Sequence, residues 1–197
     1  MKKFLILLTD AGSGHRSAAN ALKKAIEIVS PDQFDVEIHD ILKLLAVPPY
    51  DSGDRLYSSV TKNAVLEYIH NIIFNIANGD IGFEVMSDEL VKKLYSGFEK
   101  FVFSQSPEYI ISVHPTISIL LSEFKKRNPK FKTATVITDL VTLNRGWADL
   151  NSDLVFSPTK EAVSVLTSYG VKMEKIKYPL FPINPDIQLF NKDKNAV

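Results

Sequence analysis

The chain contains no cysteine. That absence excludes a disulfide framework and any metal site built on thiolates, and it fits a cytoplasmic protein. An excess of charge of one sign is also lacking, because 23 lysines and arginines balance 23 acidic residues to give a formal net charge of zero. A balanced chain has no broad positive field that would attract nucleic acid. We therefore expect no nucleic-acid partner.

Long hydrophobic runs are missing as well. The apolar run at residues 4–8 ends at Thr9 and Asp10, so it is shorter than the roughly 7–15 residues of a signal-peptide core. No segment approaches the roughly 20 apolar residues of a transmembrane helix. We expect a buried first strand and a cytoplasmic protein, peripheral at most at the inner face of a membrane.

Helix and strand patterns alternate along most of the 197 residues. Apolar stripes at helical spacing alternate with short apolar runs typical of strands buried in a parallel sheet. This order predicts an α/β fold with a doubly wound, mostly parallel sheet, Rossmann-like in outline. The expected strands are 4–9, 35–40, 108–113, 133–138, 153–156 and 175–178, and the expected helices between them are 15–29, 117–126 and 160–168.

Two further helical stretches, 55–76 and 87–103, form an insertion at about residues 55–103 relative to a minimal alternation. We predict one domain over residues 1–186, which is long enough to bury a substantial core. Residues 187–197 are expected to be a polar tail.

The first strand runs into a glycine turn and a histidine: Gly12, Ser13, Gly14 and His15. A helix that begins at such a turn presents free N–H groups, which suit phosphates or hydroxyl-rich ligands, and a histidine titrates near neutral pH. A dinucleotide site would need a third glycine, where this chain has Ser17. A tight strand-to-helix turn without a ligand is the alternative.

Polar side chains follow two later strands. His114 precedes a proline after one strand, and Thr138 and Asp139 end another. Parallel strands end at the same edge of a sheet, so we expect these residues to lie near His15. Asp139 could orient a histidine or accept a proton itself. The alternatives are a turn residue for His114 and a helix or loop cap for Asp139. We expect no cofactor and no metal.

Two segments indicate a membrane. Residues 68–76 are more apolar than a surface helix requires, and residues 125–132 form a basic run interrupted by Phe131. Each lysine or arginine near an anionic bilayer contributes about 1 kcal/mol of attraction. The alternatives are a core helix and a solvated helix end. Trp147 lies in a predicted loop, where it could sit at an interface or in the core.

Three blocks together resemble a known family. Residues 12–19 (GSGHRSAA) are similar to the Gly-x-Gly-His-x-x-(Ala/Ser)-Ala opening of the monogalactosyldiacylglycerol synthases and processive diacylglycerol glucosyltransferases. Residues 135–140 (TVITDL), followed by Trp147 and residues 156–161, resemble the second block of that family. Residues 112–115 (SVHP) are similar to its His-Pro at a strand end.

The resemblance implies the N-terminal, acceptor-binding half of a GT-B glycosyltransferase, in which a hexose moves from a nucleotide sugar such as a UDP-sugar to a diacylglycerol-type lipid. It implies that His15 lies in the cleft between the two halves, as the acceptor base or as a group near the sugar diphosphate, with Gly12, Ser13 and Gly14 beside the donor phosphates. We take His15 as the first candidate for the catalytic base and Asp139 as the second. The resemblance also implies that His114, Thr138 and Trp147 line the acceptor side. The implied partners are the lipid acceptor and the nucleotide-sugar donor. An anionic membrane surface is a further candidate partner, because of the basic run at 125–132.

Two departures from the family pattern matter. Members of the family continue for about another domain after the segment that corresponds to residues 178–183, so the donor-binding half is expected to be absent here and the chain alone inactive. Residues 141–144 also differ from the Cys-His pair of plant members. A lipid- or partner-binding module without catalysis is the main alternative, and another nucleotide-dependent enzyme, such as a sugar epimerase, is a third.

Overall fold

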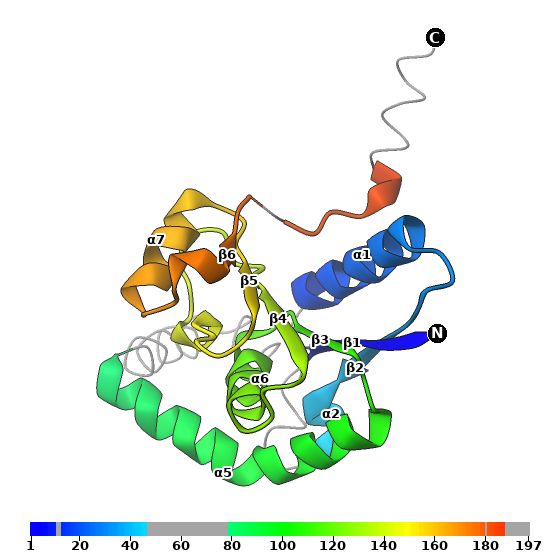
Figure 1. Cartoon of the computed structure of the whole chain (residues 1–197). Helices are drawn as coiled ribbons and strands as arrows, with labels where there is room; N and C mark the ends of the chain where they lie inside the picture. Colours follow the sequence, from blue (N-terminus) through cyan, green and yellow to red (C-terminus); the bar gives the residue numbers. More distant parts are fainter. Residues whose placement is uncertain (11–12, 47–78, 180, 188–197) are drawn as a thin grey trace.

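The computed structural model describes residues 1–10, 13–46, 79–179 and 181–187. Figure 1 shows a central sheet with helices on both sides. The strands are β1 (Lys2–Leu8), β2 (Phe34–Asp40), β3 (Tyr109–Ser112), β4 (Lys132–Val136), β5 (Leu154–Phe156) and β6 (Ile176–Lys177). The helices are α1 (Ser13–Val29), α2 (Ile41–Leu45), α5 (Asp80–Gln105), α6 (Pro115–Arg127) and α7 (Lys160–Ser168), with short 3-10 turns η2 (Arg145–Trp147) and η3 (Met173–Lys175).

The sheet has six strands in the order β2-β1-β3-β4-β5-β6. Every pairing among these strands is parallel. The chain therefore starts one strand in from an edge of the sheet, adds β2 at that edge, and returns past β1 to add the other strands on the far side. This reversal of direction between β1 and β3 creates the crevice in which open α/β sheets bind ligands.

Helices cover both faces of the sheet, which explains the continuous apolar strands. On one face α1 packs on a cluster that includes Ile6, Leu8 and Val136. On the other face α5 and α6 bury a larger cluster, with Phe98 and Phe124 in edge-to-face contact. A third cluster joins α7 to β5, β6 and the segment around η2. The prediction of a doubly wound, parallel α/β fold is confirmed.

Most predicted elements are present with shifted ends. The helix predicted at 87–103 is α5, which begins seven residues earlier at Asp80. The strand predicted at 133–138 ends as β4 at Val136, which leaves Thr138 and Asp139 in the loop beyond it. The short helix α2 was not predicted, and the predicted helix at 55–76 lies outside the described residues.

Candidate active site

His15 lies near the start of α1, and its ring reaches across to the end of β3. Its Nδ1 is 2.8 Å from the backbone oxygen of Val113. A carbonyl oxygen can only accept, so Nδ1 carries the hydrogen and donates it. The hydroxyl oxygen of Thr138 lies 3.0 Å from the same nitrogen and shares that N–H as a second acceptor. In the neutral ring this leaves the lone pair on Nε2, which is therefore the basic nitrogen of His15.

The groups around His15 have opposing effects on its pKa. Burial lowers the pKa of His15 because a partly desolvated ring disfavours the charged form. The hydrogen bond to Val113 and the negative charge of Asp139 act against this, since both stabilise the imidazolium. The ring is therefore neutral at physiological pH and has groups beside it that stabilise the proton once it arrives.

His114 is the second histidine of the cluster, and it has a structural task. Its ring lies edge to face with that of His15, with 4.5 Å between the ring centroids. His114 is the N-cap of α6, where its Nδ1 accepts the backbone N–H of Thr116 at 3.2 Å. Burial lowers the pKa of His114 to about 3, so the ring stays neutral and packs against His15.

Asp139 follows β4 and is bound by a tryptophan. The indole N–H of Trp147 donates to Asp139 Oδ2 at 2.7 Å. Trp147 is fully buried, and its ring centroid lies 6.1 Å from that of His15. The indole therefore fixes the carboxylate beside the His15 ring. Trp147 thus supports the carboxylate, and its contact with an acceptor stays a prediction.

The turn that carries Trp147 packs tightly on the start of α6. A Cβ on Gly146 would lie 3.0 Å from the backbone oxygen of Pro115 and 3.0 Å from Asn144 Oδ1. Asn144 caps η2 by accepting the backbone N–H of Gly146 at 2.8 Å. Any other residue would require the turn or its neighbours to shift by a few tenths of an ångström, so the glycine allows the turn that carries Trp147 to pack this closely on α6.

The cluster as a whole joins the carboxyl ends of β1, β3 and β4. It combines a base with a defined free nitrogen, a neutral histidine packed on it and a carboxylate held nearby. Such a set can take a proton from a hydroxyl and stabilise the resulting charge. Among the described residues no group of three or more His, Asp or Glu side chains could hold a metal ion.

Comparison with known proteins identifies the family. Residues 15–183 match the family model of monogalactosyldiacylglycerol (MGDG) synthase. The chain belongs to the MGDG synthase family. It is 26% identical over 209 residues to monogalactosyldiacylglycerol synthase 3, chloroplastic, of Arabidopsis thaliana. It is also 26% identical over 200 residues to monogalactosyldiacylglycerol synthase, chloroplastic, of Spinacia oleracea.

The chain matches only part of these MGDG synthases. All of the chain is aligned in both comparisons, but it covers 42% of the Arabidopsis protein and 38% of the spinach protein. Among solved structures, the apo form of a lipopolysaccharide outer core galactosyltransferase, WaaB, matches with a TM-score of 0.50 and 11% identity. That match covers 93% of this chain and 46% of the other. It supports the Rossmann-like fold of a GT-B half.

The glycine turn of the family motif is described in part. Gly12 lies outside the described residues, and Ser13 is the first residue of α1, with its side chain not described. Gly14 is exposed within α1, and a Cβ built on it meets no atom within 4 Å. The fold of the described residues therefore gives no reason for a glycine at position 14.

The basic run at 125–132 lies at the opposite edge of the sheet from His15. Several of its basic residues have acidic partners: Lys125 pairs with Asp153 at 2.7 Å, Arg127 with Glu123 at 2.6 Å and Lys132 with Glu108 at 3.4 Å. No described helix is long and apolar enough to cross a bilayer. The apolar segment 68–76 lies outside the described residues.

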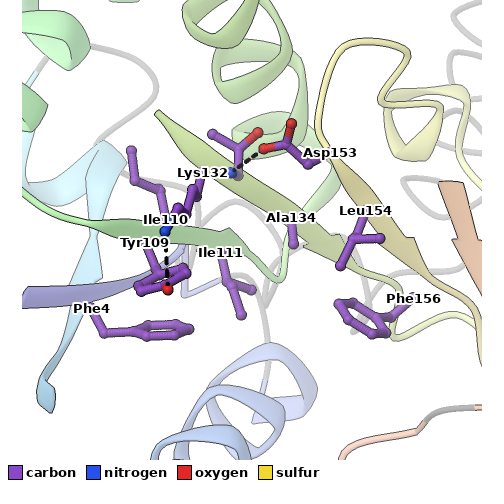
Figure 2. Close-up of a pocket in the computed structure, with 10 residues that line it drawn as sticks. Phe4, Tyr109, Ile110, Ile111, Lys132, Ala134, Asp153, Leu154 and Phe156 are labelled. Atoms are coloured by element: carbon purple, nitrogen blue, oxygen red, sulfur yellow. Dashed lines mark hydrogen bonds between the residues drawn. The ribbon is translucent and has the colours of Figure 1, made fainter. Parts of the chain in front are cut away.

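An open apolar groove of about 330 Å³ is also remote from the cluster. Figure 2 shows that side chains lining the groove, such as Phe4, Tyr109 and Phe156, lie on the face of the sheet that α1 covers. The groove is lined by the first residues of β3, β4 and β5, so it lies at the amino edge. None of its lining residues belongs to the His15 cluster.

Sequence reasoning identified five residues that the fold brings together: His15, His114, Thr138, Asp139 and Trp147. It missed Val113, whose contribution is a backbone oxygen and leaves no trace in residue type. It also missed Gly146, although a glycine directly before the chain's single tryptophan was a usable signal.

Proposed function

We propose that these residues form the acceptor-binding half of a glycolipid glycosyltransferase. The reaction moves a hexose from a nucleotide sugar to a diacylglycerol-type lipid, and it requires a donor-binding half beyond this chain. The supporting observation is the 2.8 Å hydrogen bond from His15 Nδ1 to the Val113 carbonyl. That bond leaves Nε2 as a base at the carboxyl edge of the sheet, where α/β folds bind their substrates.

In the proposed step, His15 Nε2 takes the proton of the acceptor hydroxyl. The acceptor oxygen forms a bond to the anomeric carbon of the sugar as the bond from that carbon to the diphosphate breaks. The nucleoside diphosphate leaves with the bonding electrons. The new imidazolium keeps its Nδ1–H bond to Val113 and gains stabilisation from the Asp139 carboxylate. General-base catalysis of this kind contributes roughly 10²- to 10⁴-fold in rate.

The donor phosphates are assigned to the turn at Gly12, Ser13 and Gly14. The exposed start of α1 offers backbone N–H groups that favour negative charge. Gly14 supports this assignment, because a glycine in a helix costs about 1 kcal/mol relative to alanine and its Cβ position is empty. Close approach of a ligand or of the second half would account for that cost.

The acceptor lipid is assigned to the loop after Asp139. Leu140 and Val141 are 54% and 58% exposed there, adjacent in sequence to the carboxylate beside His15. These apolar side chains suit acyl chains or the surface of a bilayer. Membrane contact at this loop would direct the catalytic edge to the lipid, whereas contact through residues 125–132 would direct it away.

The test is a transfer assay with a radiolabelled UDP-hexose and diacylglycerol in vesicles. The 197-residue chain alone is expected to give no glycolipid. The chain fused to a donor-binding half should give product, and His15→Ala in that fusion should lower turnover about 100-fold or more. Unchanged turnover of the His15→Ala enzyme would refute the proposed base.

A lipid-binding module without catalysis is the second candidate, and the exposed Leu140 and Val141 favour it as much as they favour an acceptor site. The two candidates predict different results when a donor-binding half is fused to the chain. Flotation of the chain with vesicles, together with a fusion that never transfers sugar, would support the module. Transfer by the fusion would exclude it.

A further inference from the structure

Asp10 and Arg16 form a two-point ion pair across the junction between β1 and α1. Arg16 Nε donates to Asp10 Oδ1 at 2.9 Å, and Arg16 Nη2 donates to Asp10 Oδ2 at 2.6 Å. Paired parallel hydrogen bonds of this kind fix both the distance and the orientation of the two groups. The Asp10–Arg16 fork thus connects the segment after β1 to the first turn of α1.

The Asp10 end of the fork is itself anchored. Its backbone N–H donates to Asp40 Oδ2 at 3.2 Å, and Lys43 Nζ donates to Asp10 Oδ2 at 3.2 Å. Asp40 ends β2 and caps α2 by accepting the backbone N–H of Lys43. The Arg16 fork, followed by Lys43, lowers the pKa of the Asp10 carboxyl. Asp10 is therefore a charged, fixed point tied to two strands.

The first turn of α1 has a second attachment on its other side. His15, the residue before Arg16, donates to the carbonyl of Val113 at the end of β3. Arg16 thus connects the turn to the ends of β1 and β2 through Asp10, and His15 connects it to the end of β3. Shifting or rotating the start of the helix would strain both attachments, so the fork opposes any movement that would break the His15 bond.

We propose that Asp10 and Arg16 are positioning residues that hold the start of α1 so that the His15 ring keeps its Nδ1–H on the Val113 carbonyl and its Nε2 free. The proposal rests on the function above only for the use made of His15. The fork is partly exposed, since 36% of the Arg16 side chain and 24% of the Asp10 side chain are accessible. Partly exposed ion pairs contribute little to stability, so the fork acts mainly by fixing the position of the helix start. A displacement of about 1 Å at a reacting group can cost about 100-fold in rate.

The test uses the 197-residue chain labelled with ¹⁵N and reads the imidazole signals of His15, with His15→Gln for assignment. The wild-type ring is expected to show a protonated Nδ1 and an unprotonated Nε2. Arg16→Ala and Arg16→Lys remove the fork, because an ammonium cannot bind a carboxylate through two fixed donors. In both variants the two nitrogen signals should move toward the average of the two tautomers, since the ring in water favours Nε2–H.

Lys24→Ala is the matched control, because Lys24 lies on the same helix as Arg16 and forms an ion pair with Asp186, near the C-terminal end of the described residues. Its His15 signals should match wild type, and circular dichroism should report a folded chain for all variants. If Arg16→Ala fails to fold, Arg16→Lys, which keeps the charge, decides the result. Wild-type His15 signals in a folded Arg16 variant would overturn the positioning role but would say nothing against the proposed transfer reaction. A failed transfer assay would count against the proposed reaction but would not change the His15 signals.

Discussion

The indole N–H of Trp147 donates a 2.7 Å hydrogen bond to Asp139 Oδ2, and this bond links a fully buried side chain to the carboxylate beside His15. Hydrogen bonds to charged groups contribute about 1.5–3 kcal/mol to stability. The tryptophan therefore keeps the carboxylate where its charge acts on the His15 ring.

Asp139→Asn tests this electrostatic link. The amide oxygen still accepts from Trp147, but the negative charge that favours the imidazolium is gone. Burial already lowers the pKa of His15, and the charge of Asp139 opposes that effect, so the variant should have a still lower His15 pKa. A ¹H–¹³C NMR titration of His15 measures it. An unchanged or higher pKa would refute the role given to Asp139.

His114→Asn tests the buried neutral histidine through pH-dependent stability. Folding lowers the pKa of His114 from 6.5 to about 3, so unfolding takes up a proton between these values. The unfolding free energy should fall as pH decreases from 6.5, by about 1.4 kcal/mol per pH unit for this group. Asparagine can still cap α6 but does not titrate.

Urea denaturation at pH 6.5 and pH 5 provides the measurement. Wild type should lose stability between the two, and His114→Asn should lose about 1–2 kcal/mol less over the same interval. Some slope remains in the variant because the pKa of His15 is also lowered. Equal slopes for the two proteins would show that His114 is already charged in the folded chain.

Gly146→Ala tests the close packing that positions Trp147. The new methyl group would lie 3.0 Å from the Pro115 carbonyl oxygen, so η2 must move, at a cost of about 1–3 kcal/mol. Trp147 is the chain's single tryptophan, and its fluorescence reports the change directly. The emission should shift to longer wavelength as the indole becomes more exposed.

Gly14→Ala is the matched control, since its methyl group meets no atom within 4 Å. It should leave the emission unchanged and raise the stability of the chain by up to about 1 kcal/mol through helix propensity. Identical emission from Gly146→Ala and wild type would mean that the turn tolerates the methyl group without moving the indole.

The sequence was sufficient for the architecture, because buried parallel strands and amphipathic helices leave clear patterns of apolar residues. It missed α2, whose five residues are too few to show a helical period. The approach of His15 to Thr138, 123 positions apart, followed from the rule that parallel strands end at one edge.

Residue roles were harder to predict than residue positions. His114 caps α6, a role that Pro115 at the first helical position indicates, and its place at the acceptor stays a prediction. The full burial of Trp147 could not be predicted from its place in a loop, and its contact with the acceptor also stays a prediction. The partner of His15 is a backbone carbonyl, which every residue possesses.

His15→Asn provides the most direct test that His15 Nε2 is the base. The asparagine amide can replace the Nδ1–H donor to the Val113 carbonyl, but it has no counterpart of Nε2. In the fusion with a donor-binding half, the variant should keep the wild-type melting temperature while its kcat falls about 100-fold or more. Wild-type turnover by this folded variant would contradict the account.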